Sequence, residues 1–299
     1  MATDRFDQSA RFVARFDPEG FLAWLVPGFG KHLRFRRWLD TRTAPAPGQP
    51  NQTADTVAEL ASLHRVESPW LLLLEMQTEP DPEMFGRLLG QLGKFWREHQ
   101  PDDLPGSSYQ LLAAVVNLTG TKESLPASRS FAFPLEGLGL GLAVKERYLA
   151  EESAKATLDT IAAGATARSL LALIPLMTGG GEKDIIKRWL EVAATEPDHR
   201  RRGDLGILAL TMAELKPWYG KWQKALKEWN MRESTVVQEW IDKGKAENLR
   251  ENLRRTLTTR FGAVSVELLR RIDASTDFGQ LDRAFDQALT VTRLEDLRF

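Results

Sequence analysis

The sequence predicts an α/β fold in which a mixed sheet is flanked by helices and followed by a helical extension. Two nearly continuous apolar runs, 70–77 (WLLLLEMQ) and 109–118 (YQLLAAVVNL), have the length and composition of buried strands. Residues 80–99 between them carry apolar side chains at three- and four-residue spacings, which predicts an amphipathic helix. After residue 152 the apolar spacing is helical almost throughout.

The first predicted elements are a short helix and two strands. An Asp-Pro pair opens the helix over 17–26, because aspartate is a good N-cap and proline suits the first helical position. Residues 32–39 and 53–63 are predicted strands. The segment 43–52 between them holds three prolines and a glycine and is predicted to be a loop.

The sheet is predicted to continue through a crossover. The run 70–77 is apolar on both faces, which indicates a central strand. The helix 80–99 then leads to a strand at 109–118 that we expect to be parallel to it. Residues 142–149 are expected to add a further strand.

From residue 152 onward the sequence predicts helices. Trp218, Trp222 and Trp229 in this part are expected to be a core stripe rather than a platform for stacking bases. The arginines at 200–202 are expected in a loop. The predicted helical segments are 158–163, 167–177, 183–194, 206–222 and a long one at 236–261, which stops at Gly262 and precedes two shorter helices.

The composition is that of a globular protein without a membrane partner. Of the 299 residues, 42% are hydrophobic and 27% are charged, and the net charge of −1 excludes a global field that attracts nucleic acid or anionic membrane. The absence of cysteine excludes disulfides and thiolate metal sites. No secretory signal is visible, and the apolar runs are shorter than the about 20 residues of a membrane span. We therefore expect a cytoplasmic protein.

Glu75 and Gln77 end the predicted central strand and should face the same side of the sheet. Side chains alternate along a strand, so Leu74 and Met76 should face the opposite side. An ionised carboxylate at this place is costly unless it is paired or bound to a cation. Glu75 alone is therefore compatible with an arginine pair or with exposure where the strand ends.

A second carboxylate, Asp55, belongs to the preceding predicted strand, and antiparallel pairing can bring it beside Glu75. Together with the main-chain carbonyl of Met76 and waters, the two acids would form an oxygen-rich site suited to Mg²⁺ or Mn²⁺. Such a metal polarises a phosphodiester and lowers the pKa of an attacking water. Gln77 would hold that water.

The predicted elements follow in a characteristic order: a helix, a strand, the strand with Asp55, the strand with Glu75-Met76-Gln77, a helix and a strand. In this order the chain resembles the PD-(D/E)XK nuclease superfamily, and more specifically the recombination-promoting nuclease (Rpn) and putative transposase family. The stretches that carry the resemblance are 53–60 (TADTVAEL), 72–81 (LLLEMQTEPD), 84–96 (MFGRLLGQLGKFW), 170–180, 231–244 and 253–262.

The resemblance implies a metal-dependent DNA endonuclease that takes part in recombination or transposition. It implies Asp55 and Glu75 as catalytic metal ligands, and Gln77 in the place of the superfamily's lysine. Glu19 on the first helix would be an accessory acid, although the helix dipole also explains an acid in a first turn. Because glutamine carries no charge, the metal would have to supply nearly all the charge stabilisation. The alternative is a nuclease fold that has lost the chemistry and serves as a DNA-binding or oligomerisation module.

Basic residues are candidates for contacts with DNA phosphates. Arg34, Arg36 and Arg37 lie together in the strand 32–39. Further basic residues are distributed along the long C-terminal helix. Such residues neutralise phosphates without reading bases, and the alternative is a solvated face.

We place a boundary near Asn230, which gives a nuclease-like domain at 1–230 and a charged helical domain at 231–299. The long helix 236–261 has a narrow apolar stripe that suits pairing with another helix. We therefore expect a homo-oligomer formed through the C-terminal helices.

Overall fold

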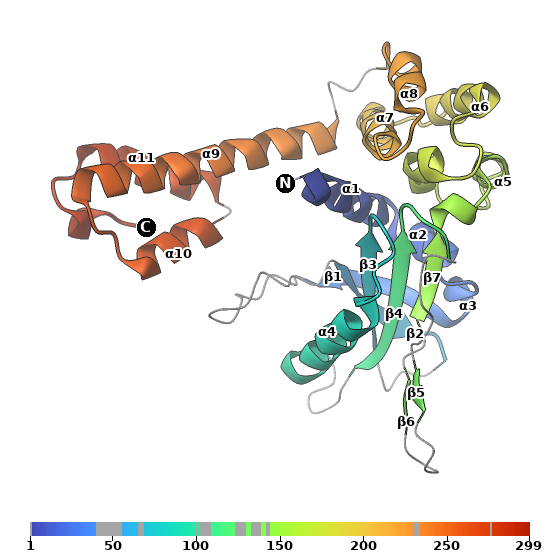
Figure 1. The fold of residues 1–299 in the computed structure, drawn as a ribbon, viewed down its shortest axis with the longest axis horizontal. Helices are drawn as coiled ribbons and strands as arrows, with labels where there is room; N and C mark the ends of the chain where they lie inside the picture. Colours follow the sequence, from blue (N-terminus) through green and yellow to red (C-terminus); the bar gives the residue numbers. More distant parts are fainter. Residues whose placement is uncertain are drawn as a thin grey trace. The chain divides into compact units, whose positions relative to one another are not determined.

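A computed structural model describes residues 2–39, 56–64, 69–99, 101, 109–122, 130–132, 139–141, 144–229, 234–275 and 277–299. The chain divides into two compact units, Met1–Asn230 and Met231–Phe299, and each is described by itself (Figure 1). Asp55, the predicted partner of Glu75, lies outside the described residues.

A five-stranded mixed sheet forms the centre of the first unit, which confirms the predicted α/β class (Figure 1). The strand order is β1-β2-β3-β4-β7, and β1, β2 and β3 pair antiparallel. β3 pairs with β4 and β4 with β7 in parallel, so the predicted parallel crossover is confirmed. The bounds are β1 (Leu33–Leu39), β2 (Thr56–Ser62), β3 (Trp70–Gln77), β4 (Gln110–Asn117) and β7 (Val144–Tyr148), and a separate pair is β5 (Ser130–Ala132) with β6 (Gly139–Gly141).

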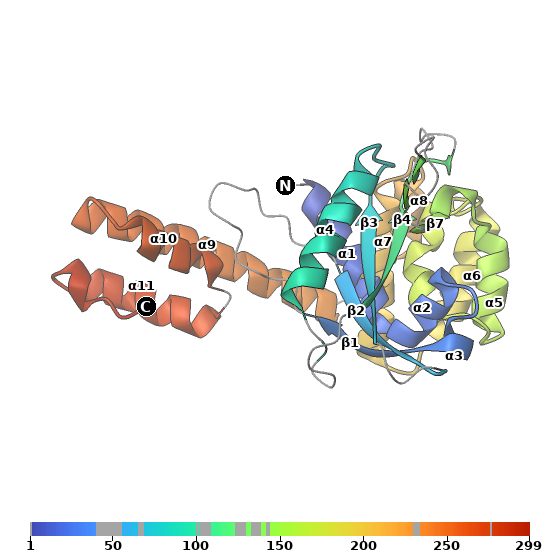
Figure 2. The same ribbon diagram turned by 90° about the horizontal axis from the view of Figure 1, so that it is seen from below.

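β3 is buried because helices cover both faces of the sheet. Leu71 and Leu73 pack in one cluster with Leu88 and Leu92 of α4 (Met84–Glu98), the predicted crossover helix. The other face is covered by α2 (Pro18–Leu25), which contacts the two edge strands β1 and β7. Figure 2 shows α4 and α2 on opposite sides of the sheet.

The N-terminal helices follow from their caps and their apolar spacing. Asp17 accepts a hydrogen bond from the Gly20 amide at 3.1 Å and so starts α2, as predicted. A short helix, α3 (Phe29–His32), connects it to β1. α1 (Ala2–Phe16) precedes α2. This helix was not predicted from the sequence, although its residues Ala10 and Val13 are fully buried.

Helices complete the first unit after β7. The predicted helix 167–177 is a 3₁₀ helix over 168–176, and Pro175 lies within it. The predicted helix 206–222 is wrong as one element, because the chain turns at Pro217 between two helices. The elements are η2 (Leu149–Glu151), α5 (Ala154–Ala162), η3 (Arg168–Leu176), α6 (Lys183–Ala194), α7 (His199–Ala213) and α8 (Tyr219–Ala225).

The loop predicted for the arginines 200–202 is wrong, because these residues form the first turn of α7. The Asp198 carboxylate accepts hydrogen bonds from the amides of Arg200 at 2.8 Å and Arg201 at 3.2 Å, which caps the helix. An N-cap aspartate therefore sets the start of α7 earlier than the apolar spacing indicates.

Tryptophans form a second core among these helices, in which Trp222 of the predicted stripe is joined by Trp189. Trp218 of that stripe is half-buried, and its indole donates to the Pro175 carbonyl at 2.9 Å. Trp189 and Trp222 are fully buried and meet edge to face, with ring centroids 5.4 Å apart. The indole of Trp222 donates to the Gly180 carbonyl at 2.9 Å. Trp229 also packs on Trp189, with ring centroids 5.5 Å apart.

The second unit consists of α9 (Thr235–Phe261), α10 (Val266–Ala274), α11 (Phe278–Thr290) and η4 (Leu294–Asp296), which confirms the predicted long helix and two shorter ones. Gly262 ends α9 with a φ of +73°, a conformation that favours glycine. Leu253 and Leu257 of α9 are buried against Ala284 and Ala288 of α11. Part of the apolar stripe of α9 is therefore used within the unit. Among the residues that the structure describes, no helix combines the length and apolar character needed to cross a bilayer.

Candidate functional site

Glu75 and Gln77 lie on the α4 face of the sheet, at the end of β3. They continue the row of Leu71 and Leu73, which confirms that both polar side chains share one face. Glu75 is 6% exposed and Gln77 is 8% exposed. The apolar row therefore changes to a carboxylate and an amide while it is still buried.

Arg87 of α4 pairs with Glu75. One guanidinium nitrogen lies 2.9 Å from Glu75 Oε1 and the other lies 2.8 Å from Asp81 Oδ2. Asp81 stands just before α4 and also accepts a hydrogen bond from the Glu83 amide at 2.8 Å. The three side chains form a row of carboxylate, guanidinium and carboxylate with a net charge of −1. The arginine pair, one of the two alternatives for Glu75, is thus present.

Gln77 belongs to a row of amides that crosses three strands. Its Nε2 donates to Asn117 Oδ1, and Asn117 Nδ2 donates to the Arg147 carbonyl of β7 at 3.2 Å. The pairing of Gln77 with Asn117 across the parallel strands brings the two amides together. Gln77 Oε1 is buried and accepts no hydrogen bond from any described residue. This oxygen is a buried acceptor that no described residue uses.

The main chain of β3 directs the Met76 carbonyl toward the β2 side. The carbonyl of Pro69 accepts from the Gln110 amide, and that of Gln77 accepts from the Leu118 amide just after β4. The main-chain groups of the odd-numbered residues of β3 therefore form the hydrogen bonds with the parallel strand β4. Met76 is even-numbered, and its main-chain groups therefore face the other neighbour, β2. The first described residue of β2, Thr56, pairs with Leu74.

Glu19 does not accompany Glu75. Its carboxylate accepts a hydrogen bond from the Phe35 amide of β1 at 3.0 Å, and its side chain is exposed. β2 separates β1 from β3, and two strand spacings correspond to about 10 Å. In this structure Glu19 holds the edge strand to α2.

Two of the three predicted phosphate contacts form ion pairs within the protein. Arg36 and Arg37 contact the buried carboxylate of Glu59 at 3.2 Å and 2.7 Å. Their side chains are still 42% and 52% exposed. Arg34 is exposed on the same strand. Arg36 and Arg37 therefore keep accessible surface although each is paired with Glu59.

The oxygen atoms at the end of β3 are ligands of the type that a hard divalent cation prefers, but their number is too small for a complete coordination shell. Glu75 supplies a carboxylate, Met76 a carbonyl directed toward β2, and Gln77 a buried amide oxygen without a hydrogen-bond donor. Within the described ranges, no three histidine, aspartate or glutamate side chains come close enough together to hold a metal. A complete ligand set would have to include a residue outside those ranges.

Arg87 and Asn117 belong to this site but were not predicted. Arg87 is an exposed residue of α4 beside the buried stripe of Met84 and Leu88, so the apolar spacing of the helix does not single it out. Asn117 ends an otherwise apolar strand at the same place as Gln77. An amide at the end of an apolar run is therefore a signal for Asn117, whereas no sequence signal indicates Arg87.

Comparison of the chain with protein-family models, with curated proteins and with solved structures found no match.

Proposed function

We propose that the protein is a metal-dependent endonuclease that hydrolyses DNA phosphodiester bonds at the end of β3. The observation that carries this proposal is the position of Glu75 and Gln77, which share a buried face at the end of the central strand. The order of α2, β1, β2, β3, α4 and β4 agrees with the PD-(D/E)XK fold that the motifs resemble.

In this proposal Asp55, Glu75 and the Met76 carbonyl hold Mg²⁺ or Mn²⁺. The pairing of Thr56 with Leu74 supports the choice of Asp55. In the sequence Asp55 directly precedes Thr56 and Glu75 directly follows Leu74, which is the order that antiparallel pairing would place opposite each other. When bound, the cation supplies positive charge to the phosphate and lowers the pKa of a bound water. Gln77 orients that water through Oε1, since its Nε2 is held by Asn117.

Arg87 supplies the positive charge that Gln77 lacks. A lysine in place of Gln77 would carry charge at the end of β3, and the Arg87 guanidinium reaches the same carboxylate from α4. Its side chain is 43% exposed, so it is accessible to a phosphate. Arginine binds phosphate oxygens in pairs of hydrogen bonds, which suits a developing negative charge.

A plasmid-nicking assay with Mg²⁺ or Mn²⁺ tests the proposal. We expect cleavage by the wild type that EDTA abolishes, and a loss of at least about a hundredfold in Glu75→Gln, since the variant removes a charged metal ligand. Glu98→Gln, an exposed acid of α4, is the matched control and should cleave as the wild type does. Equal cleavage by all three proteins would reject the assignment of Glu75.

The second candidate is a non-catalytic module that binds DNA or assembles through its C-terminal helices. The Glu75–Arg87–Asp81 row favours it, because an arginine already neutralises the carboxylate that should bind the cation. Calorimetric titration with Mn²⁺ separates the two candidates. Binding that is lost in Glu75→Gln supports the nuclease, and the absence of binding together with the absence of cleavage supports the module.

A further inference from the structure

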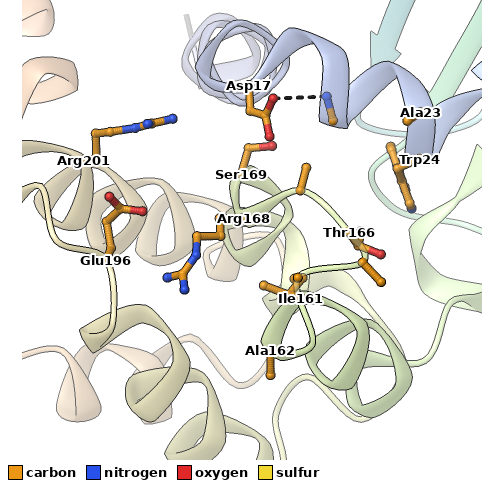
Figure 3. Close-up of a pocket in the computed structure, with 14 residues that line it drawn as sticks. Asp17, Ala23, Trp24, Ile161, Ala162, Thr166, Arg168, Ser169, Glu196 and Arg201 are labelled. Atoms are coloured by element: carbon orange, nitrogen blue, oxygen red, sulfur yellow. Dashed lines mark hydrogen bonds between the residues drawn. The ribbon is translucent and has the colours of Figure 1, made fainter. Parts of the chain in front are cut away.

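A cavity of about 550 Å³ lies between α2, η3 and the start of α7, but its polar groups do not converge (Figure 3). The Arg168 and Ser169 side chains point to opposite sides, and Ser169 lies beside the Asp17 carboxylate (Figure 3). Side chains arranged in this way do not hold one ligand together. Two metal-ligating side chains do lie close together elsewhere in the first unit, where α3 meets β1 and β2 ends.

His32 and His64 lie side by side although they are far apart in the sequence. His32 is the last residue of α3, and His64 follows the end of β2 by two positions. Their ring centroids are 5.3 Å apart, and the ring planes are inclined by 56°. Both residues are exposed, so an ion from the solvent reaches them.

The backbone fixes the separation of the two histidines. Leu33, the first residue of β1, pairs with Ser62, the last residue of β2. The Leu63 amide donates to the His32 carbonyl at 2.9 Å. The His64 amide donates to the Ser62 hydroxyl at 3.2 Å. The two imidazoles therefore extend from adjacent, hydrogen-bonded strand ends, and this arrangement suits a preorganised site.

A main-chain hydrogen bond determines which nitrogen of His64 can bind an ion. Its Nε2 lies 3.0 Å from the Lys31 carbonyl. Because a carbonyl can only accept, Nε2 carries the hydrogen, and in the neutral ring Nδ1 carries the lone pair. Histidines that bind metals usually donate their second nitrogen to a carbonyl or a carboxylate in this way.

The separation of the rings fits two imidazoles on one tetrahedral ion. With metal–nitrogen distances of about 2.0–2.1 Å, the centroids of two such rings lie about 5 Å apart. Imidazole nitrogen suits Zn²⁺, Ni²⁺ and Cu²⁺, whereas Mg²⁺ prefers oxygen ligands. The pair therefore favours a transition metal over the hard cation proposed for the end of β3.

We propose that His32 and His64 bind one Zn²⁺ ion, with water in the remaining positions. The ion links the junction of α3 and β1 to the end of β2, and it stabilises this edge of the sheet. The site shares no residue with the proposed nuclease site, and it does not depend on that proposal.

Isothermal titration calorimetry of the full chain with ZnCl₂ tests this inference, in a buffer with excess Mg²⁺ to occupy oxygen sites. We expect Zn²⁺ to bind the wild type. His32→Gln and His64→Gln should each weaken binding at least about tenfold, since even residues that only support a metal ligand have effects of this size. His199→Gln, which replaces an exposed histidine of α7, is the matched control and should bind as the wild type does.

Thermal unfolding gives a second readout. Zn²⁺ should raise the melting temperature of the first unit in the wild type and in His199→Gln, because it binds the folded state. It should not do so in His32→Gln or His64→Gln. Without Zn²⁺, His32→Gln should melt as the wild type does, since the replaced side chain is exposed.

Three results would overturn the inference. The first is that the wild type does not bind Zn²⁺. The second is that binding survives unchanged in either His32→Gln or His64→Gln, which would leave only an aromatic contact between the rings. The third is that Glu75→Gln abolishes binding, since this would put the ion at the end of β3.

Discussion

Replacing Arg87 with glutamine should destabilise the first unit, because it removes the ion pair with a buried carboxylate. The side chain of Glu75 is 8% exposed and that of Arg87 is 43% exposed. A surface pair contributes about 0–1 kcal/mol, and breaking a fully buried pair costs about 3–5 kcal/mol. Because only one partner is buried, we expect a loss of about 2 kcal/mol in the free energy of unfolding.

Differential scanning calorimetry in EDTA measures this loss. For a unit of this size, about 1 kcal/mol lowers the melting temperature by about 2–4 °C, so Arg87→Gln should melt about 4–8 °C below the wild type. Arg97→Gln, on an exposed position of the same helix, should melt within about 1 °C of the wild type. The double variant Glu75→Gln, Arg87→Gln should recover part of the loss, since no buried charge then remains. If Arg87→Gln melts with the Arg97→Gln control, the pair does not stabilise the site.

Three other substitutions test the fold. Trp222→Ala should lower the stability of the first unit by about 3–5 kcal/mol in calorimetry, whereas Trp96→Ala, at a position 55% exposed, should change it little. Leu253→Ala should lower only the transition of the second unit, by about 2–5 kcal/mol, and Leu289→Ala, 51% exposed, should not; equal effects would contradict the observed packing. The Arg201 amide bonded to Asp198 holds the pKa of that carboxyl below its ordinary value of 3.8. The resulting stability is present above that value and is lost as the pH falls through the lower folded pKa, so urea unfolding of Asp198→Ala should depend less on pH there than that of the wild type.

The sheet could be predicted from the sequence because its apolar runs and amphipathic spacings are continuous and local. The run 70–77 is apolar on both faces and matches β3 in both bounds, and the amphipathic spacing of 80–99 contains α4. α1 was missed because its charged residues hide a repeat of buried positions. The start of α7 was missed because three arginines suggest a loop, whereas the capping aspartate before them determines the helix.

The candidate site could be predicted only where one strand carries it. The shared face of Glu75 and Gln77 follows from the two-residue period of a strand. Arg87 and Asn117 come from other elements, and their contacts depend on how α4 and β4 pack on β3. The cavity is formed by Trp24, Arg168 and Glu196, which are far apart in the sequence, so no local pattern indicates it.

The row of amides from Gln77 through Asn117 has a consequence for acidity. Neither side chain gains or loses a proton between pH 2 and pH 12, whereas a lysine would lose its charge at about pH 10. Gln77 Nε2 therefore remains the donor and Asn117 Oδ1 the acceptor at every pH at which the sheet is folded. Whatever binds Gln77 Oε1 meets an acceptor whose direction protonation cannot reverse.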